Sequence, residues 1–176
     1  MARFRPAARR GTLLAGLVLA VAAFAPGSAL ADVGGSNLPL KGSFTGTSTY
    51  YPATCAAHIV ITGQMTHLGL MTLEQDACIT HTPDNQTYTI VSGNWTMTAA
   101  NGDQLFGTAT GTGIRTDASH VTYTVVRTST GGTGRFADAS ATGTGTMYVH
   151  TVAVEPGPPV IAHNELDGMF DGQLSW

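Results

Sequence analysis

The sequence predicts an all-β protein folded as a single eight-stranded antiparallel closed β-barrel. Threonine, a β-branched residue that suits a half-exposed strand, occurs 26 times between residues 32 and 176. The 22 glycines of the chain interrupt it too often for long helices, and no window shows a convincing helical period. Segments with strand character instead follow one another at even spacing, separated by turn residues. Closure into a barrel removes the two exposed edges that an open sheet of this size would have.

Residues 1–31 have the pattern of an export signal. Four arginines lie within the first ten residues, an apolar run follows at 12–24, and small residues suited to cleavage stand at 29–31. The apolar run is shorter than the roughly 20 residues that span a bilayer. We expect cleavage after Ala31, by general or twin-arginine export, and a secreted, extracellular, soluble protein. The expected organisation is a signal peptide at 1–31, a short lead-in at 32–42 and a barrel domain at 43–176.

The region after the signal is acidic. Four basic residues face 11 acidic ones there, which leaves a net charge of −7. A nucleic-acid-binding domain would carry the opposite charge, so we expect no nucleic-acid partner. Only 11% of the chain is charged and apolar residues are spread evenly, which argues against disorder.

Eight strand segments can be placed along this region. Asn101-Gly102 lies between the fourth and fifth segments and is typical of a type I′ hairpin turn. The proline-rich residues 155–159 cannot pair in a sheet and predict an exposed loop before the last strand. The expected strands are residues 43–51, 57–65, 68–79, 87–99, 104–113, 120–129, 142–154 and 167–176.

Cys55 and Cys78 are the two cysteines of the chain, and an exported protein usually joins such a pair. A hairpin that turns at Thr66-His67 places them directly opposite each other at the far ends of its strands. No basic neighbour makes either sulfur reactive. We therefore expect a structural disulfide and no free thiol, with a stabilisation of about 3 kcal/mol from loop closure.

Alternation along three strands indicates which side chains face the barrel interior. Arg127 falls on this face, and a buried guanidinium needs a partner. We expect Arg127 to lie near a barrel mouth or to meet a carboxylate such as Glu74 or Asp171. The expected interior residues are Val91, Gly93, Trp95, Met97 and Ala99 in the fourth strand, Val121, Tyr123, Val125 and Arg127 in the sixth, and Phe170, Leu174 and Trp176 in the last.

Four segments, at 66–69, 98–103, 130–139 and 167–176, resemble a group of secreted bacterial proteins of unassigned activity. The Gly-Gly-Thr-Gly-Arg-Phe element at 131–136 is similar to one in plant dirigent proteins and allene oxide cyclases. Those plant families share an eight-stranded antiparallel barrel around an apolar cavity. The resemblance implies a calycin or allene-oxide-cyclase-like barrel here. The acidic and arginine pocket residues of the plant enzymes align with no motif of this chain and are not carried over.

The glycine element is interpreted as a structural turn. Gly131, Gly132 and Gly134 let the chain reverse where a side chain would clash, and Phe136 can plug a barrel end. A phosphate-binding loop would need a Gly-Lys-Ser/Thr sequence and a following helix, and the element has neither.

Candidate chemistry is sparse. The chain has no Gly-x-Ser-x-Gly elbow, and its cysteines are expected to be joined, so covalent hydrolysis has no obvious nucleophile. The six histidines do not form a three- or four-ligand metal pattern, and we expect no metal and no cofactor. Paired carboxylates for glycoside cleavage would require convergence of four acidic residues, Glu74, Asp76, Asp167 and Asp171.

Three functions remain open. The first is a secreted barrel that holds a small apolar ligand in its interior, with Trp95, Met97, Tyr123 and Phe170 as its lining. The second is an isomerase or cyclase without a cofactor, in which Tyr123 and Arg127 polarise a substrate oxygen and act as catalytic residues. The third is an extracellular interaction or envelope protein with a filled barrel. A homo-oligomer is compatible with each of them.

Overall fold

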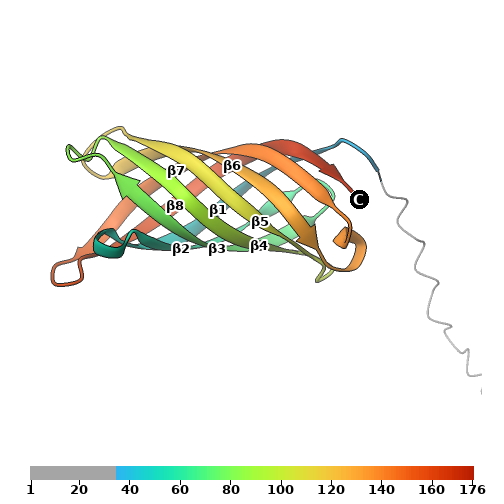
Figure 1. Ribbon diagram of the computed structural model, residues 1–176, viewed down its shortest axis with the longest axis horizontal. Coiled ribbons are helices and arrows are strands. Elements are labelled where there is room, and N and C mark those ends of the chain that lie inside the picture. The colour runs from blue at the N-terminus through green and yellow to red at the C-terminus, as the bar shows by residue number, and fades with distance from the viewer. Residues whose placement is uncertain (1–34) are drawn as a thin grey trace, which may run out of the picture. The chain divides into compact units, whose positions relative to one another are not determined.

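A computed structural model of the chain describes residues 35–176, which form eight strands and two short 3-10 helices (Figure 1). The predicted signal peptide and its cleavage site lie outside these residues. No helix in the described part of the chain is long and apolar enough to cross a membrane. The elements are β1 (Leu38–Tyr51), η1 (Pro52–Thr54), β2 (Ala56–Met65), β3 (Gly69–His81), β4 (Thr87–Ala99), β5 (Gln104–Arg115), β6 (His120–Gly132), η2 (Gly134–Phe136), β7 (Ser140–Glu155) and β8 (Ile161–Ser175).

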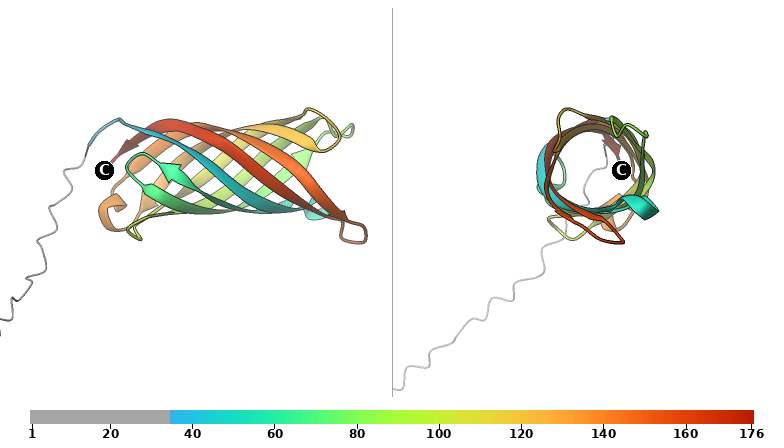
Figure 2. Two further views of the ribbon diagram at one scale, coloured as in Figure 1. Left: turned by 180° about the vertical axis from the view of Figure 1, so that it is seen from behind. Right: turned by 90° about the vertical axis from the view of Figure 1, so that its left-hand side faces the viewer.

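The eight strands form a closed antiparallel barrel. Each strand pairs with the next one in sequence, and β8 pairs with β1 to complete the ring. The end-on view in Figure 2 shows this ring directly. The predicted fold class, including one disulfide, is therefore confirmed, and closure leaves none of the eight strands with an unpaired edge.

The strands that close the barrel are longer than the sequence pattern indicates. β1 begins at Leu38, inside the region expected as a lead-in, and β8 begins at Ile161. These extensions pair along their length, with Leu38 opposite Leu174 and Tyr50 opposite Ala162. Each extension gains its hydrogen-bonding partner only when β1 and β8 meet, and the residue pattern of a single strand does not reveal this pairing.

Alternation places the interior residues of β6 and β8 as predicted, but a bulge changes the face of β4. The register against β5 shifts between Ile90 and Asn94. Ile90 is therefore buried, at 1% exposure, and Val91 is on the outside at 54%. The prediction that Val91 faces inward is wrong, because a bulge inserts an extra residue and reverses the alternation on one side of it.

The β4–β5 hairpin also differs from its prediction. The amide of Gly102 donates to the carbonyl oxygen of Ala99, and the amide of Ala99 donates to that of Asp103, both at 2.9 Å. Gly102 has a φ of +88°, whereas Asn101 has no positive φ. The type I′ turn, which needs two positive φ values, is therefore wrong, and the loop is a three-residue hairpin with a left-handed glycine.

The Cys55–Cys78 disulfide is present, with the two Cα atoms 4.8 Å apart. Its predicted register is off by one residue, because Ala56 and not Cys55 lies opposite Cys78. Cys55 follows η1 with a φ of +56° and joins the neighbouring strand diagonally. The amide of Ile79 donates to the carbonyl oxygen of Cys55 at 2.7 Å, which holds the same corner.

One end of the barrel is closed by side chains. The β6–β7 connection contains η2, whose Phe136 is fully buried. The ring of Phe136 meets that of Trp176 edge-on at 5.8 Å, and the Trp176 ring lies 5.5 Å from that of His67. Leu174 is also fully buried at this end. Aromatic packing of this kind fills the barrel there.

Candidate functional site at the open end of the barrel

The opposite end of the barrel contains a cavity of about 560 Å³. It lies among the ends of the strands near η1 and the β7–β8 loop, at the left in Figure 1. Apolar side chains dominate the inner wall, including Ile59, Ile79, Met147 and Val149. The interior of one barrel is thus filled at one end and hollow at the other.

Three tyrosines line this cavity. The rings of Tyr88 and Tyr123 lie 6.2 Å apart and tilted, and the hydroxyl of Tyr50 donates to the carbonyl oxygen of Ile79 at 3.0 Å. Burial, and to a lesser extent the neighbouring Tyr88, raises the pKa of both Tyr50 and Tyr123. Both hydroxyls therefore remain protonated donors at neutral pH.

Tyr123 is the tyrosine with an unused hydroxyl. Its side chain is buried at 6% exposure, and within residues 35–176 this hydroxyl makes no hydrogen bond. The oxygen of this hydroxyl is not one of the solvent-inaccessible unpaired atoms of the described residues, so it reaches the surface of the cavity that Tyr123 lines. The hydroxyl is therefore available to a molecule inside the cavity.

Arg115 organises the mouth of the cavity. Its Nε donates to the carbonyl oxygen of Asn85 at 2.8 Å and its Nη1 to that of Ala118 at 2.9 Å. Its Nη2 donates to the hydroxyl of Tyr88, and the guanidinium carbon lies 5.5 Å from the centre of that ring. One side chain thus joins the β3–β4 loop, the β5–β6 loop and an aromatic wall.

The facing wall carries a short polar chain that is internally satisfied. Thr151 donates from its hydroxyl to Oδ1 of Asn164 at 2.8 Å, and Nδ2 of Asn164 donates to the hydroxyl of Ser48 at 3.0 Å. Asn164 is buried, and all three residues line the cavity. This chain fixes the polarity of that wall without leaving an amide group unpaired.

Arg127 lies deeper in the barrel and is not among the cavity-lining residues. It is 4% exposed, and its Nε and Nη2 donate to Oε1 of Gln75 at 3.3 and 3.0 Å. Burial lowers the pKa of Arg127 to about 10. The expectation of a mouth position or a carboxylate partner is wrong. Glu74 and Asp171 point outward from their strands, and the interior partner is the neutral Gln75.

The structure divides the predicted ligand-lining residues between the two halves of the barrel. Tyr123 lines the cavity. Trp95, Met97 and Phe170 are buried in the core and do not line it, and Nε1 of Trp95 already donates to the carbonyl oxygen of Thr108 at 2.9 Å. Sequence reasoning missed Tyr50, Tyr88 and Arg115, whose alternation in β1, β4 and β5 is obscured by strand ends and the β4 bulge.

The four acidic residues considered for glycoside cleavage do not converge. Glu74 and Asp76 are exposed on β3, whereas Asp167 and Asp171 are exposed on β8, and the two strands β1 and β2 lie between them. Asp171 is instead paired with Lys41 at 2.8 Å. No cluster of three or more His, Cys, Asp or Glu side chains in residues 35–176 is arranged to hold a metal ion.

The glycine element lies at the closed end, away from the cavity. Gly134 has a φ of +57°, and a Cβ there would lie 1.8 Å from Oδ1 of Asp103. A Cβ at Gly132 would lie 2.4 Å from the carbonyl oxygen of Phe136. Because glycine has no Cβ, the backbone can approach these atoms closely, turn inward and place Phe136 in the barrel.

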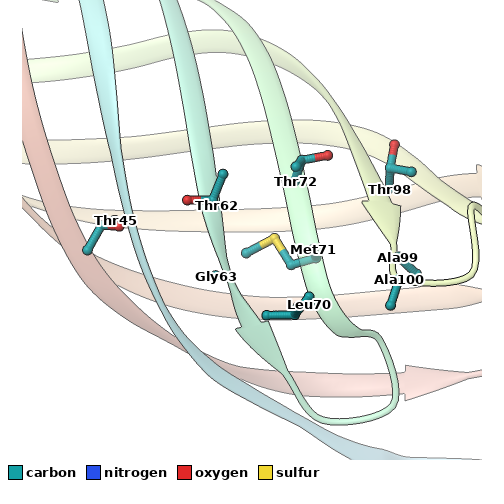
Figure 3. Close-up of a pocket in the computed structure, with 9 residues that line it drawn as sticks. All are labelled: Thr45, Thr62, Gly63, Leu70, Met71, Thr72, Thr98, Ala99 and Ala100. Atoms are coloured by element: carbon teal, nitrogen blue, oxygen red, sulfur yellow. The ribbon is translucent and has the colours of Figure 1, made fainter.

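A shallow groove on the outer face is a second candidate surface. Figure 3 shows the threonines that β1 to β4 contribute to it, together with Leu70, which is 71% exposed. Strand pairing places Thr45, Thr62, Thr72 and Thr98 in one row across these strands. The groove is open and lined without charged side chains.

Comparison with protein-family models, with curated proteins and with solved structures finds no match for this chain. The resemblance to dirigent proteins and allene oxide cyclases therefore stays a prediction. The geometry of the cavity is the basis for assigning a function.

Proposed function

We propose that the protein is a secreted carrier that holds one small, largely apolar molecule in the cavity at the open end of its barrel. The observation that supports this most is the asymmetry of the interior. Phe136 and Trp176 fill one end, whereas a cavity of about 560 Å³ opens at the other. A volume of this size lies within the range of small-molecule pockets, which are mostly apolar with a few oriented polar groups.

The polar groups of the cavity fit this role. The Tyr123 hydroxyl supplies a donor with no partner among the described residues, and Tyr50 and Arg115 already use theirs to hold the walls and loops. A ligand with one oxygen directed at Tyr123 would pair with a donor at the cavity surface while its apolar body contacts Ile59 and Met147.

Two further features support an extracellular location. The export pattern of residues 1–31 precedes the barrel, and the Cys55–Cys78 disulfide is typical of proteins that fold in an oxidising compartment.

An isomerase or cyclase is the second candidate. The same unpaired Tyr123 hydroxyl favours it, because a protonated donor in a largely apolar pocket can stabilise negative charge on a substrate oxygen. Turnover of a bound molecule would distinguish this activity from simple carriage.

Binding is tested with the neutral fluorescent probe 1-aminoanthracene and with native mass spectrometry of protein purified from its own host. We expect saturable probe binding and an extra mass that is lost on denaturation. Ala57→Trp narrows the cavity and should abolish both signals. Thr62→Trp, in the outer groove, is the matched control and should leave them unchanged. Binding that survives Ala57→Trp in a folded variant, or that Thr62→Trp removes, would contradict the cavity as the binding site.

A further inference from the structure

The barrel interior contains a positive charge with no counter-charge. Arg127 is the one charged side chain that is buried within residues 35–176, where the other buried polar residues are Gln75 and Asn164. Its hydrogen bonds go to the amide oxygen of Gln75, which is neutral. A buried guanidinium without a carboxylate is costly, and such a cost is commonly retained for function.

Two donors of this pair remain unused. The Gln75 residue is only 1% exposed, and its Nε2 is inaccessible to solvent and has no hydrogen-bond partner. Nη1 of Arg127 also makes no hydrogen bond within the described residues, because its Nε and Nη2 are the atoms that bind Gln75. Unpaired donors beside a positive charge are the groups that an oxyanion requires.

Both side chains extend from their strands toward the open end. Nη1 of Arg127 lies 3.5 Å from the position that a Cβ would take at Gly145, which pairs with Val125. Among the inward-facing residues of β6, Val125 lies between Arg127 and Tyr123, so it is nearer to the cavity than Arg127 is.

Gln75 leans in the same direction. Its Nε2 lies 3.2 Å from the position that a Cβ would take at Gly93, which pairs with Ala77. On the inner face of β3, Ala77 lies between Gln75 and Ile79, and Ile79 lines the cavity. Ile59, also in the lining, is the β2 partner of Gln75. Because Gly93 and Gly145 have no side chain, no Cβ stands against the two unused donors, which lie between the filled half and the cavity.

We propose that Arg127 and Gln75 form an anion-recognition subsite directly beneath the floor of the cavity, and that the ligand is an apolar molecule carrying one carboxylate. This inference rests on the proposed carrier function and specifies its ligand class. The guanidinium is already desolvated and held by Gln75, so an incoming carboxylate meets a charge whose burial cost is present before binding. The single interior charge matches a monoanion.

The test compares two matched ligand pairs at pH 7 by calorimetry: octanoate with octanol, and 4-phenylbutyrate with 4-phenylbutanol. The members of each pair share their apolar body and differ in charge. A charge-assisted hydrogen bond predicts that the wild-type protein binds the acid roughly 10- to 100-fold more tightly than the alcohol. Arg127→Met should remove this preference while leaving alcohol affinity within about threefold, because the cavity walls are unchanged.

Two control variants identify the positive charge that binds the carboxylate. Lys41→Met removes an exposed charge on the outer face and should keep the preference. Arg115→Met removes the charge at the mouth. Loss of the preference in Arg115→Met but not in Arg127→Met would overturn the floor subsite. The variants are compared only after circular dichroism and thermal melting show that they are folded. The comparison of acid with alcohol in the wild-type protein does not depend on the folding of any variant.

The outcomes separate the two proposals. Equal binding of acid and alcohol to the wild-type protein would overturn the anion subsite and leave the carrier function standing. Absence of binding by all four compounds, together with no response to 1-aminoanthracene, would overturn both proposals.

Discussion

The two ends of the barrel are built from the same eight strands and the same alternation, yet one is packed and the other is hollow. At the closed end, η2 turns inward and brings Phe136 against Trp176. At the open end, Arg115 ties neighbouring loops around a cavity walled by tyrosines. The comparison shows that the strands supply a barrel, whereas the connections decide whether its end is filled.

The largest expected effect is at the closed end. Phe136→Ala removes a fully buried ring and should lower the free energy of unfolding by about 3–5 kcal/mol. Met147→Ala, which widens a cavity that already exists, should cost only about 2 kcal/mol. Urea denaturation of both variants checks the difference. Equal losses would show that the two ends are packed alike.

The disulfide is the covalent constraint of the open end. Cys55→Ser combined with Cys78→Ser should cost about 3 kcal/mol, because the unfolded chain regains the entropy of the open loop. Denaturant titration measures this loss, and ligand affinity should fall with it because Ile79 is held at the same corner. Thiol titration of the denatured, unreduced protein should find no free cysteine, and two titratable thiols would refute the bond.

Arg127→Met combined with Gln75→Leu should stabilise the unliganded protein by about 1–4 kcal/mol, because apolar side chains replace a buried charge that no carboxylate compensates and the buried amide that would otherwise lose its partner. The pKa of Arg127 is lowered to about 10 from 12.5, so the unfolded state binds more protons between these values. The charge burial cost is present below pH 10 and is relieved as pH rises above it. The advantage of the variant over wild type should therefore shrink above pH 10. Chemical denaturation at pH 8 and pH 11 measures it, and a destabilised variant would contradict an uncompensated charge.

The smallest expected effect concerns the turn that seats Phe136. Gly134→Ala combines a positive φ with a clash against Asp103 and should cost about 1–3 kcal/mol. Gly102→Ala is the matched control, because Gly102 also has a positive φ but has nothing within 4 Å of its Cβ position. Thermal melting should show the larger loss for Gly134→Ala. A reversed order would mean that the glycine element does not need its close approach to Asp103.

Much of the fold was predictable from the chain alone. Threonine content, glycine spacing and alternation gave eight strands, and β4 has the predicted bounds of 87–99. The cysteine pair and the plugging role of Phe136 also followed from local pattern. These features depend on residues close in sequence or on the two-residue period of a strand.

Less of the candidate site could be predicted from the sequence. Tyr123 and Arg127 were found by alternation, but Tyr50, Tyr88 and Arg115 come together only because four loops meet at one end of the closed ring. The β4 bulge reversed the faces of Ile90 and Val91, and the polar partner of Arg127 is Gln75, 52 residues away along the chain.

The sequence by itself determined an all-β chain with eight strands, one disulfide and a turn rich in glycine, because strand alternation and turn chemistry are local properties. The tertiary structure decided which end of the barrel is open and which side chains face the cavity. It also decided that the interior charge has no carboxylate beside it. These outcomes depend on ring closure, register and the direction of each connection, which no short segment encodes alone.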